Sequence, residues 1–182
     1  MQQVKTLVQD IKGINRRNLL QQFFNLLLIL CTAVSVWKCF CVASGSESPI
    51  VVVLSGSMEP MFYRGDILFL WMEDEPLEVG EIVVFKIKDK QIPIVHRILE
   101  IDIDDNTGEQ IFLTKGDNNQ VHDRGLYNVA EEQIWLRRED VMGRVKVFLP
   151  YVGILTILLA DYPILKVGLI VIMGLMVIVG KE

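Results

Sequence analysis

The chain has 182 residues, a formal net charge of −5, and 51% apolar beside 23% charged residues. This length suits one domain with additional segments, and the mixture of apolar and charged residues indicates a soluble domain joined to membrane segments. The acidic balance offers no basic surface to nucleic acid and no nucleic-acid-binding motif occurs, so we expect no nucleic-acid partner.

The cysteines exclude one class of protein. Cys31, Cys39 and Cys41 all lie in or just after the first apolar segment, so no disulfide can form from residue 42 onward. A small secreted scaffold stapled by disulfides is therefore excluded, and the folded part must depend on its hydrophobic core.

The first element in chain order is an apolar stretch near the N-terminus. Residues 19–37 carry no charge, and a helix of these 19 residues spans about 28 Å, close to the hydrocarbon thickness of a bilayer. Four cations precede the stretch, whereas none follows Lys38 until Arg64. The positive-inside rule then predicts a cytosolic N-terminus, a transmembrane anchor at 19–42 and the remainder of the chain across the membrane.

Two alternatives concern this N-terminal region. A cleaved signal peptide has an apolar core of about 7–15 residues, and the longer stretch here, with its long preceding segment, favours an uncleaved anchor. Within residues 1–18, apolar side chains fall on one helical face and cations lie elsewhere, which predicts a short amphipathic helix on the cytosolic leaflet. A frayed tail is the alternative.

Residues 43–162 carry the pattern of a mainly β domain. Six short segments are rich in β-branched or aromatic residues, and turn-forming residues separate them. A plausible hairpin connection, Asp-Asp-Asn-Thr-Gly, occupies residues 104–108. The spacing predicts an antiparallel β-barrel or folded sheet. The six segments are residues 50–55, 66–72, 81–87, 94–102, 110–115 and 141–148.

The C-terminal end is apolar again. Pro163 suits the start of a helix, and no charge occurs from Val167 to Gly180. A helix from Pro163 to Gly180 has 18 residues and spans about 27 Å, which is marginal for crossing a bilayer. We predict a membrane-associated helix at 163–182 that crosses the bilayer, lies in its interface or packs on the anchor.

Ser57 is a candidate nucleophile. It lies in the segment Ser-Gly-Ser-Met-Glu-Pro (55–60), directly after an apolar predicted strand. A serine held where a strand breaks into a turn is exposed and has backbone N–H groups near it, as a nucleophile and an oxyanion site require. Serine is common at strand ends, so this segment alone is more often that of an ordinary strand-to-turn serine.

The chain has two histidines, His96 and His122. His96 lies among aliphatic residues on a predicted strand, where a satisfied core histidine is the alternative. His122 lies in a polar loop (114–127) beside Asp117 and Asp123. A serine protease needs a base oriented by a carboxylate, and only these histidines can serve unless a lysine does. The lysine candidates are Lys86, Lys88, Lys90 and Lys115.

The polar loop at 114–127 has a second functional interpretation as a metal site. It lacks the spacing of a calcium loop, and no cysteine or histidine pair accompanies it, so we expect no metal. Loops of this length inside a compact domain are more often functional than not.

Four blocks of sequence together resemble one family. They occur in the same order and spacing as in eukaryotic and archaeal-type signal peptidase I, peptidase family S26. The resemblance is to the Sec11-like catalytic subunits of the endoplasmic-reticulum complex, and it extends over essentially the whole chain. The blocks are VVVLSGSMEPMFYRGDILFL (51–70), VHRI (95–98), TKGDNN (114–119) and DRGLY (123–127).

The resemblance implies roles for five residues. Ser57 is expected to be the nucleophile, and His96 occupies the position where the bacterial branch of the family has a lysine base. Asp117 and Asp123 match two family aspartates, of which Asp123 is expected to orient His96. Ser55 resembles the hydroxyl that assists the oxyanion site in the bacterial branch.

The resemblance also implies an activity. We expect a serine endopeptidase that removes signal peptides from secretory and membrane precursors at the lumenal face of the endoplasmic-reticulum membrane, without a cofactor. Small substrate residues at −1 and −3 would bind as part of an extended strand. The expected partners are these precursors, membrane lipid and accessory subunits, and the expected topology is a single-pass type II protein.

Alternatives to this expectation remain. His122 stands where close relatives often have an acidic residue, so it is a rival candidate base. A Ser–Lys dyad would keep the enzyme class and move the base to a lysine. A non-catalytic membrane-anchored scaffold that retains a protease fold is the alternative from a different class.

Overall fold

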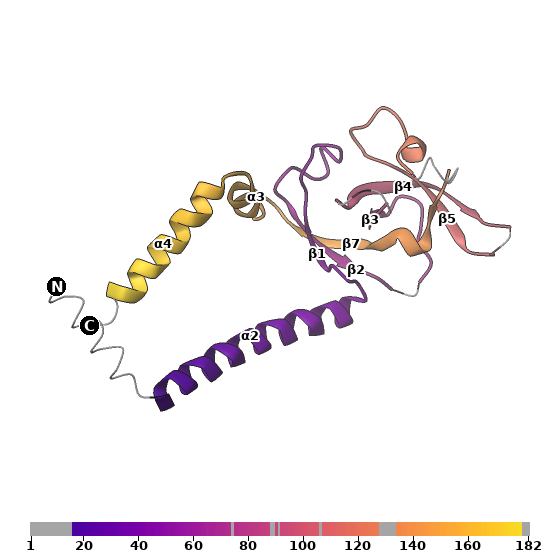
Figure 1. Cartoon of the computed structure of the whole chain (residues 1–182). Coiled ribbons are helices and arrows are strands. Elements are labelled where there is room, and N and C mark those ends of the chain that lie inside the picture. The colour runs from indigo at the N-terminus through magenta and orange to yellow at the C-terminus, as the bar shows by residue number, and fades with distance from the viewer. Residues whose placement is uncertain are drawn as a thin grey trace. The chain divides into compact units, whose positions relative to one another are not determined.

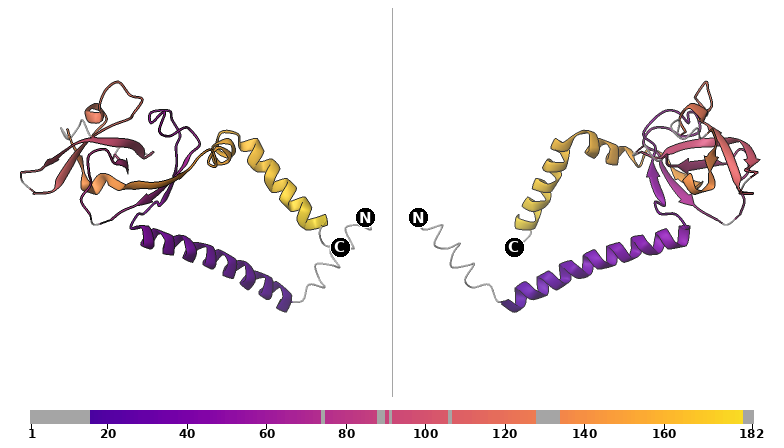
Figure 2. Two further views of the ribbon diagram at one scale, coloured as in Figure 1. Left: turned by 180° about the vertical axis from the view of Figure 1, so that it is seen from behind. Right: turned by 45° about the vertical axis from the view of Figure 1, so that its right-hand side comes forward.

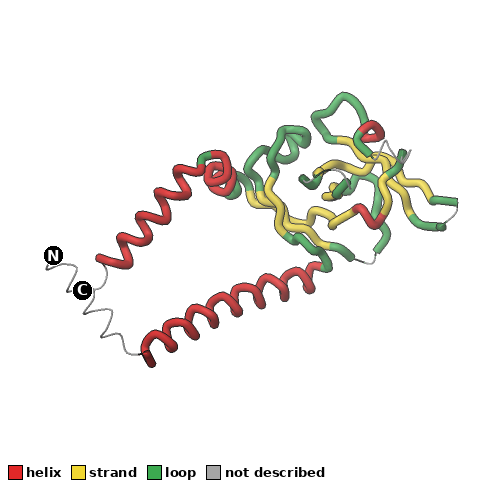
Figure 3. Tube along the Cα trace, in the orientation of Figure 1, coloured by secondary structure: helices red, strands yellow, loops and turns green. Residues whose placement is uncertain are grey.

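The computed structural model describes residues 16–73, 75–87, 90, 92–105, 107–127 and 134–179. The chain divides into two compact units, Met1–Ala43 and Ser44–Glu182, whose helices and strands are drawn in Figures 1 and 3. Most of the amphipathic segment predicted at 1–18 lies outside the described residues.

Helix α2 (Arg16–Ser44) is the apolar N-terminal element. Its segment Leu20–Ser44 has a mean hydropathy of 2.2 and is long and apolar enough to cross a membrane. Its large apolar side chains are exposed, among them Leu28 and Val36, and so much exposed apolar surface on one helix requires lipid or protein around it. The predicted N-terminal apolar helix is therefore confirmed.

The described part of the second unit holds seven strands in one antiparallel sheet, in the order β1-β2-β7-β3-β4-β5-β6. The sheet curls on itself into a half-barrel, which Figure 2 shows from behind and in a view turned by 45°. Six strands correspond to the six predicted segments, and the two-residue β6 was not predicted. The strands are β1 (Ile50–Val52), β2 (Ile67–Trp71), β3 (Ile82–Phe85), β4 (Ile94–Ile103), β5 (Gln110–Lys115), β6 (Leu136–Arg137) and β7 (Val141–Leu149).

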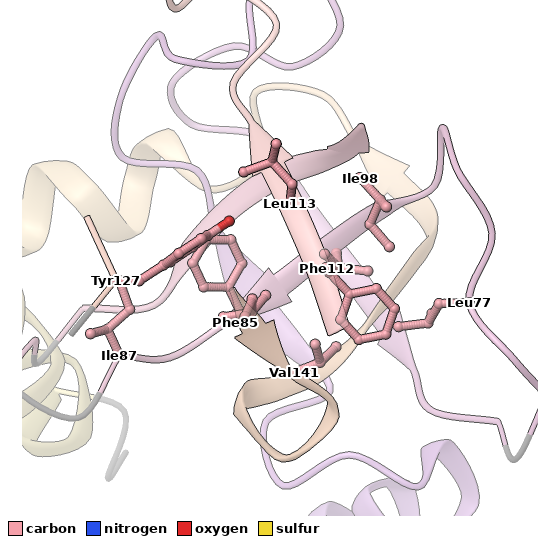
Figure 4. Close-up of a cluster of buried hydrophobic side chains, with 10 residues drawn as sticks. Leu77, Phe85, Ile87, Ile98, Phe112, Leu113, Tyr127 and Val141 are labelled. Atoms are coloured by element: carbon pink, nitrogen blue, oxygen red, sulfur yellow. The ribbon is translucent and has the colours of Figure 1, made fainter. Parts of the chain in front are cut away.

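Strand β3 contributes to two buried clusters because its side chains alternate between the faces of the sheet. Val83 and Phe85 belong to the cluster drawn in Figure 4, which also contains Phe112 and the ring of Tyr127. Ile82 and Val84 belong to the second cluster. Each fully buried apolar side chain contributes about 1.5–3 kcal/mol relative to an exposed one, so burial of β3 stabilises the domain strongly.

The long strands β4 and β5 form the hairpin predicted at residues 104–108. The Asp104 N–H donates to the Glu109 carbonyl, and the Gly108 N–H donates to the Asp104 carbonyl. Gly108 has a φ of 70°, a left-handed conformation that glycine adopts without steric cost. This hairpin fixes the register between the two strands.

Two helices follow β7. Helix α3 (Ile154–Asp161) was not predicted, since its short apolar sequence has no helical periodicity that distinguishes it from a strand. Helix α4 (Pro163–Val179) begins at the predicted proline. The two helices meet at an angle of 103°, because a residue that precedes proline, here Tyr162, is sterically driven out of the helical conformation.

Candidate active site

The structure brings Ser57, His96 and Asp123 together. The His96 ring lies 3.1 Å from Ser57 Oγ through Nε2 and 2.5 Å from Asp123 Oδ2 through Nδ1. His96 and Asp123 are 3% and 1% exposed, so water is excluded from their contact, whereas Ser57 is only partly buried. Each ring nitrogen therefore faces one of the two other groups.

Ser57 lies in the long connection between β1 and β2, which is closed at its base. The Val53 N–H donates to the Asp66 carbonyl, and the Gly65 N–H donates to the Val53 carbonyl. Met58, directly after Ser57, is 1% exposed and belongs to the second buried cluster. The buried neighbour and the closed loop base hold the serine at the surface without burying its hydroxyl.

The segment Gly116–Asn119, which follows β5, packs against the serine loop. The Asn118 N–H donates to the Ser57 carbonyl at 2.9 Å, and its side-chain amide donates to the Gly56 carbonyl at 3.1 Å. A Cβ atom at Gly116 would lie 2.6 Å from the Ser57 carbonyl oxygen and 2.8 Å from His96 Nε2. Only glycine fits between the serine and the histidine.

Asp123 begins a short 3₁₀ helix, η1 (Asp123–Gly125), and has a second partner besides His96. The buried Thr114 hydroxyl donates to Asp123 Oδ2 at 2.6 Å, and the Tyr127 hydroxyl lies 3.0 Å from the same threonine oxygen. Burial raises the pKa of Tyr127, with a smaller opposing effect of its hydrogen bonds to Thr114. No role for Thr114 or Tyr127 follows from the sequence alone, although both lie in the blocks that carry the family resemblance.

Asp117 pairs with Arg97 instead of with His96. Arg97 donates from Nε to Asp117 Oδ1 at 2.9 Å and from Nη2 to Oδ2 at 2.7 Å, and its Nη1 donates to the Gly80 carbonyl. These hydrogen bonds lower the pKa of Asp117 and raise the pKa of Arg97. Asp117 is therefore placed to hold its loop against β4.

The remaining candidate residues are Ser55, His122 and the four lysines. The Ser55 hydroxyl is 3.4 Å from Ser57 Oγ, a long contact between two exposed groups. His122 is exposed and precedes η1. Lys90 lines the groove described below, Lys86 is exposed, Lys115 is half-buried and Lys88 lies outside the described residues.

A groove of about 840 Å³ leads to Ser57 and His96. Two chain segments, 51–55 and 92–96, supply most of its lining, and their side chains are largely aliphatic. The first segment continues from β1, which lies at an edge of the sheet and, among the strands that the structure describes, pairs with β2 alone. An edge strand with an apolar groove beside it can accept an extended peptide through main-chain hydrogen bonds.

The fold and the family to which the chain is similar identify a peptidase. Residues 33–139, which include Ser57, His96 and Asp123, match the family described as Peptidase S24-like. This match covers more than half of the chain.

Curated relatives narrow the class further. The chain is 52% identical over 174 residues to the signal peptidase complex catalytic subunit SEC11C of Homo sapiens, covering 95% of this chain and 89% of that protein. It is 49% identical over the full length of both chains to the catalytic subunit sec11 of Dictyostelium discoideum. A third relative, SEC11 of Colletotrichum graminicola, is 50% identical over 92% of this chain and 96% of its own. The chain belongs to the family of signal peptidase complex catalytic subunits.

Proposed function

We propose that this chain is the catalytic subunit of an endoplasmic-reticulum signal peptidase and cleaves signal peptides with a Ser57–His96–Asp123 triad. The protein is a protease of the signal peptidase family, with signal-peptide-bearing precursors as substrates and other subunits of the complex as partners. The proposal adds the residues that carry out the reaction.

One observation supports the assignment of the triad most directly. A continuous line of contacts joins Ser57 Oγ, the two ring nitrogens of His96 and a buried carboxylate of Asp123. A carboxylate on Nδ1 fixes the tautomer that leaves Nε2 free to accept a proton, and it stabilises the imidazolium that forms. Asp117 is already engaged by two hydrogen bonds from Arg97, which supports Asp123 as the orienting group.

The reaction follows from this geometry. His96 Nε2 accepts the Ser57 proton while Oγ attacks the carbonyl carbon of the scissile bond. The protonated histidine then donates this proton to the leaving amine of the mature protein, and the signal peptide remains as an ester on Ser57. A water molecule gives a proton to His96 and attacks the ester, which releases the signal peptide and restores the serine.

Substrate recognition uses the groove beside β1. We infer that the precursor binds as an extended strand along residues 51–55, with its −1 and −3 side chains directed into the apolar groove. The aliphatic lining favours small apolar side chains at these positions. Ser55 and backbone N–H groups around Ser57 would stabilise the developing oxyanion, as such donors do in other acyl-transfer enzymes.

The membrane topology is the second part of the proposal. Residues 19–42 within helix α2 form an uncleaved anchor with the N-terminus in the cytosol, which places the catalytic domain, 43–162, in the lumen. Residues 163–182 associate with the same membrane, and residues 1–18 lie on its cytosolic face. Membrane lipid is therefore a partner of both terminal segments.

Replacement of the two histidines tests the catalytic assignment. His96→Ala should lower kcat for a model precursor in detergent by about 10³-fold or more, as removal of a triad base does. His122→Ala is the matched control, because this histidine is exposed and is the neighbour of Asp123 in the chain. A greater loss from the His122 change than from the His96 change would show that the base is assigned wrongly.

A further inference from the structure

We propose that Thr114 and Tyr127 are positioning residues of the peptidase reaction, which orient Asp123 through a buried line of hydrogen bonds. This inference rests on the proposed function, in which Asp123 in turn orients His96. The observation behind it is that Asp123 Oδ2 faces two donors, the His96 ring and the Thr114 hydroxyl, at 2.5 and 2.6 Å.

The sheet places His96 and Thr114 on the same face. In the ladder between β4 and β5, Ile98 pairs with Thr114, so these two side chains point to one side of the sheet. His96 is two residues before Ile98 and shares that side, because side chains alternate along a strand. The Asp123 carboxylate therefore meets two inward side chains from adjacent, hydrogen-bonded strands.

The direction of each proton in this line is determined by its chemistry. A hydroxyl has one proton to donate, and an ionised carboxylate only accepts, so the Thr114 proton goes to Asp123. The Thr114 N–H donates to the Tyr127 oxygen at 2.9 Å. The Tyr127 proton is then left for Thr114 Oγ1, at 3.0 Å, and the line runs from tyrosine to threonine to aspartate.

Burial excludes water from this line of hydrogen bonds. Thr114 is fully buried and Tyr127 is 2% exposed, so water cannot replace either donor. An ordinary tyrosine is already protonated at neutral pH, and burial raises the pKa of Tyr127 further, so its hydroxyl keeps the proton that it donates. The Phe85 ring packs edge-on against both His96 and Tyr127, which restricts the rotation of both rings, and Figure 4 shows the two aromatic rings of Phe85 and Tyr127 beside each other. Loss of a donor in such a line weakens the orientation of the groups that follow it.

The prediction is a loss of turnover without a loss of binding. Thr114→Val keeps the shape of the side chain and removes the hydroxyl that donates to Asp123 and accepts from Tyr127. We therefore expect kcat to fall about 10- to 100-fold while KM stays within about twofold. Thr114→Ser returns the hydroxyl and should restore kcat to within about threefold of the wild type. Thr107→Val, at the exposed β4–β5 turn, is the matched control and should leave kcat unchanged.

Tyr127→Phe provides a second, independent variant. It removes the donor to Thr114 while leaving the ring in the buried cluster, and kcat should fall about 3- to 10-fold, less than for Thr114→Val. Tyr162→Phe is its matched control, because Tyr162 is exposed at the junction of α3 and α4. All variants are measured in the full chain, in detergent and with the partner subunits, together with thermal unfolding.

Two results would overturn the inference. One is a kcat of Thr114→Val and Tyr127→Phe within about twofold of the wild type. The other is a loss that Thr114→Ser fails to restore, or that appears in KM alone. Ser57→Ala and His96→Ala in the same assay separate this failure from that of the proposed function. If these two variants are inactive while Thr114→Val is fully active, only the positioning role is wrong.

Discussion

Replacement of Gly116 by alanine tests how closely the serine and the histidine must be held. The added Cβ would lie 2.6 Å from the Ser57 carbonyl oxygen and 2.8 Å from His96 Nε2, where ordinary contacts begin at 3.4 Å. The Asn119 side-chain amide would lie 2.8 Å from the added Cβ, but it can move because it is the end of a flexible side chain. The Ser57 carbonyl is part of the backbone and accepts the Asn118 N–H, so the serine loop itself must shift.

The size of the effect follows from these distances. Relief of the contacts requires displacements of about 0.8 Å at Ser57 and about 0.6 Å at His96, and a misplacement of about 1 Å between reacting groups costs about 10²-fold in rate. We therefore expect kcat of Gly116→Ala to fall about 10²-fold. Stability should fall less than activity, since Gly116, Ser57 and His96 belong to neither of the two buried apolar clusters.

The assay compares Gly116→Ala with a glycine that has room for a side chain. Gly125 has no atom within 4 Å of its added Cβ and no left-handed φ, so Gly125→Ala should keep wild-type kcat. Both variants are assayed for precursor cleavage and for thermal unfolding. A Gly116→Ala enzyme with kcat within about threefold of the wild type would refute the reasoning, because the site would then tolerate a separation of serine and histidine.

Three further predictions follow from the site. Asp123→Asn should lower kcat by about 10⁴-fold, as loss of an orienting carboxylate does, and Asp117→Asn should cost much less. Cleavage rates and thermal melts of both variants test this ranking. If Asp117→Asn lowers kcat more than Asp123→Asn at unchanged stability, Asp117 is the residue that orients His96. Because the bond to Arg97 lowers the pKa of Asp117, its stabilising effect is complete above the ordinary aspartate pKa of about 3.9 and is lost as pH falls below it. Melting temperatures from pH 7 to pH 3 should therefore fall more steeply for the wild type than for Asp117→Asn. Lys90→Ala should keep kcat within about threefold, and a larger loss would favour a serine–lysine dyad.

The sequence predicts the strands well where its pattern is strong. Residues 94–102 alternate in polarity, and the strand observed there, β4, extends from Ile94 to Ile103. Strand β6 has two residues and α3 has eight, and neither length is enough for a periodic pattern to develop. These two elements form through contacts with the rest of the domain, which a local pattern does not contain.

Which aspartate orients His96 depends on the direction of the side chains along β4 as well as on the loop that carries Asp117 and Asp123. Neighbouring side chains on a strand point to opposite faces, so an inward His96 implies an outward Arg97. The buried Asp123 then meets the histidine, and the partly exposed Asp117 meets the arginine. The sequence alone ranked Asp123 first by resemblance, whereas the alternation along β4 gives the physical reason for the pairing.

Thr114 and Tyr127 could not be assigned from the sequence. A threonine in a strand and a tyrosine after a loop are ordinary core residues, and only the register between β4 and β5 brings the threonine hydroxyl to Asp123. Their presence in two blocks that resemble the family was the available indication. Functional groups that act through another side chain are generally of this kind, because the contact depends on tertiary structure.

The most direct test of the account is the fate of a precursor incubated with the full protein and its partner subunits. The mature N-terminus of the product is determined by mass spectrometry for the wild type and for Ser57→Ala. We predict cleavage after a small residue by the wild type and loss of about 10³-fold or more in rate for Ser57→Ala. The same product formed at the same rate by both proteins would contradict it.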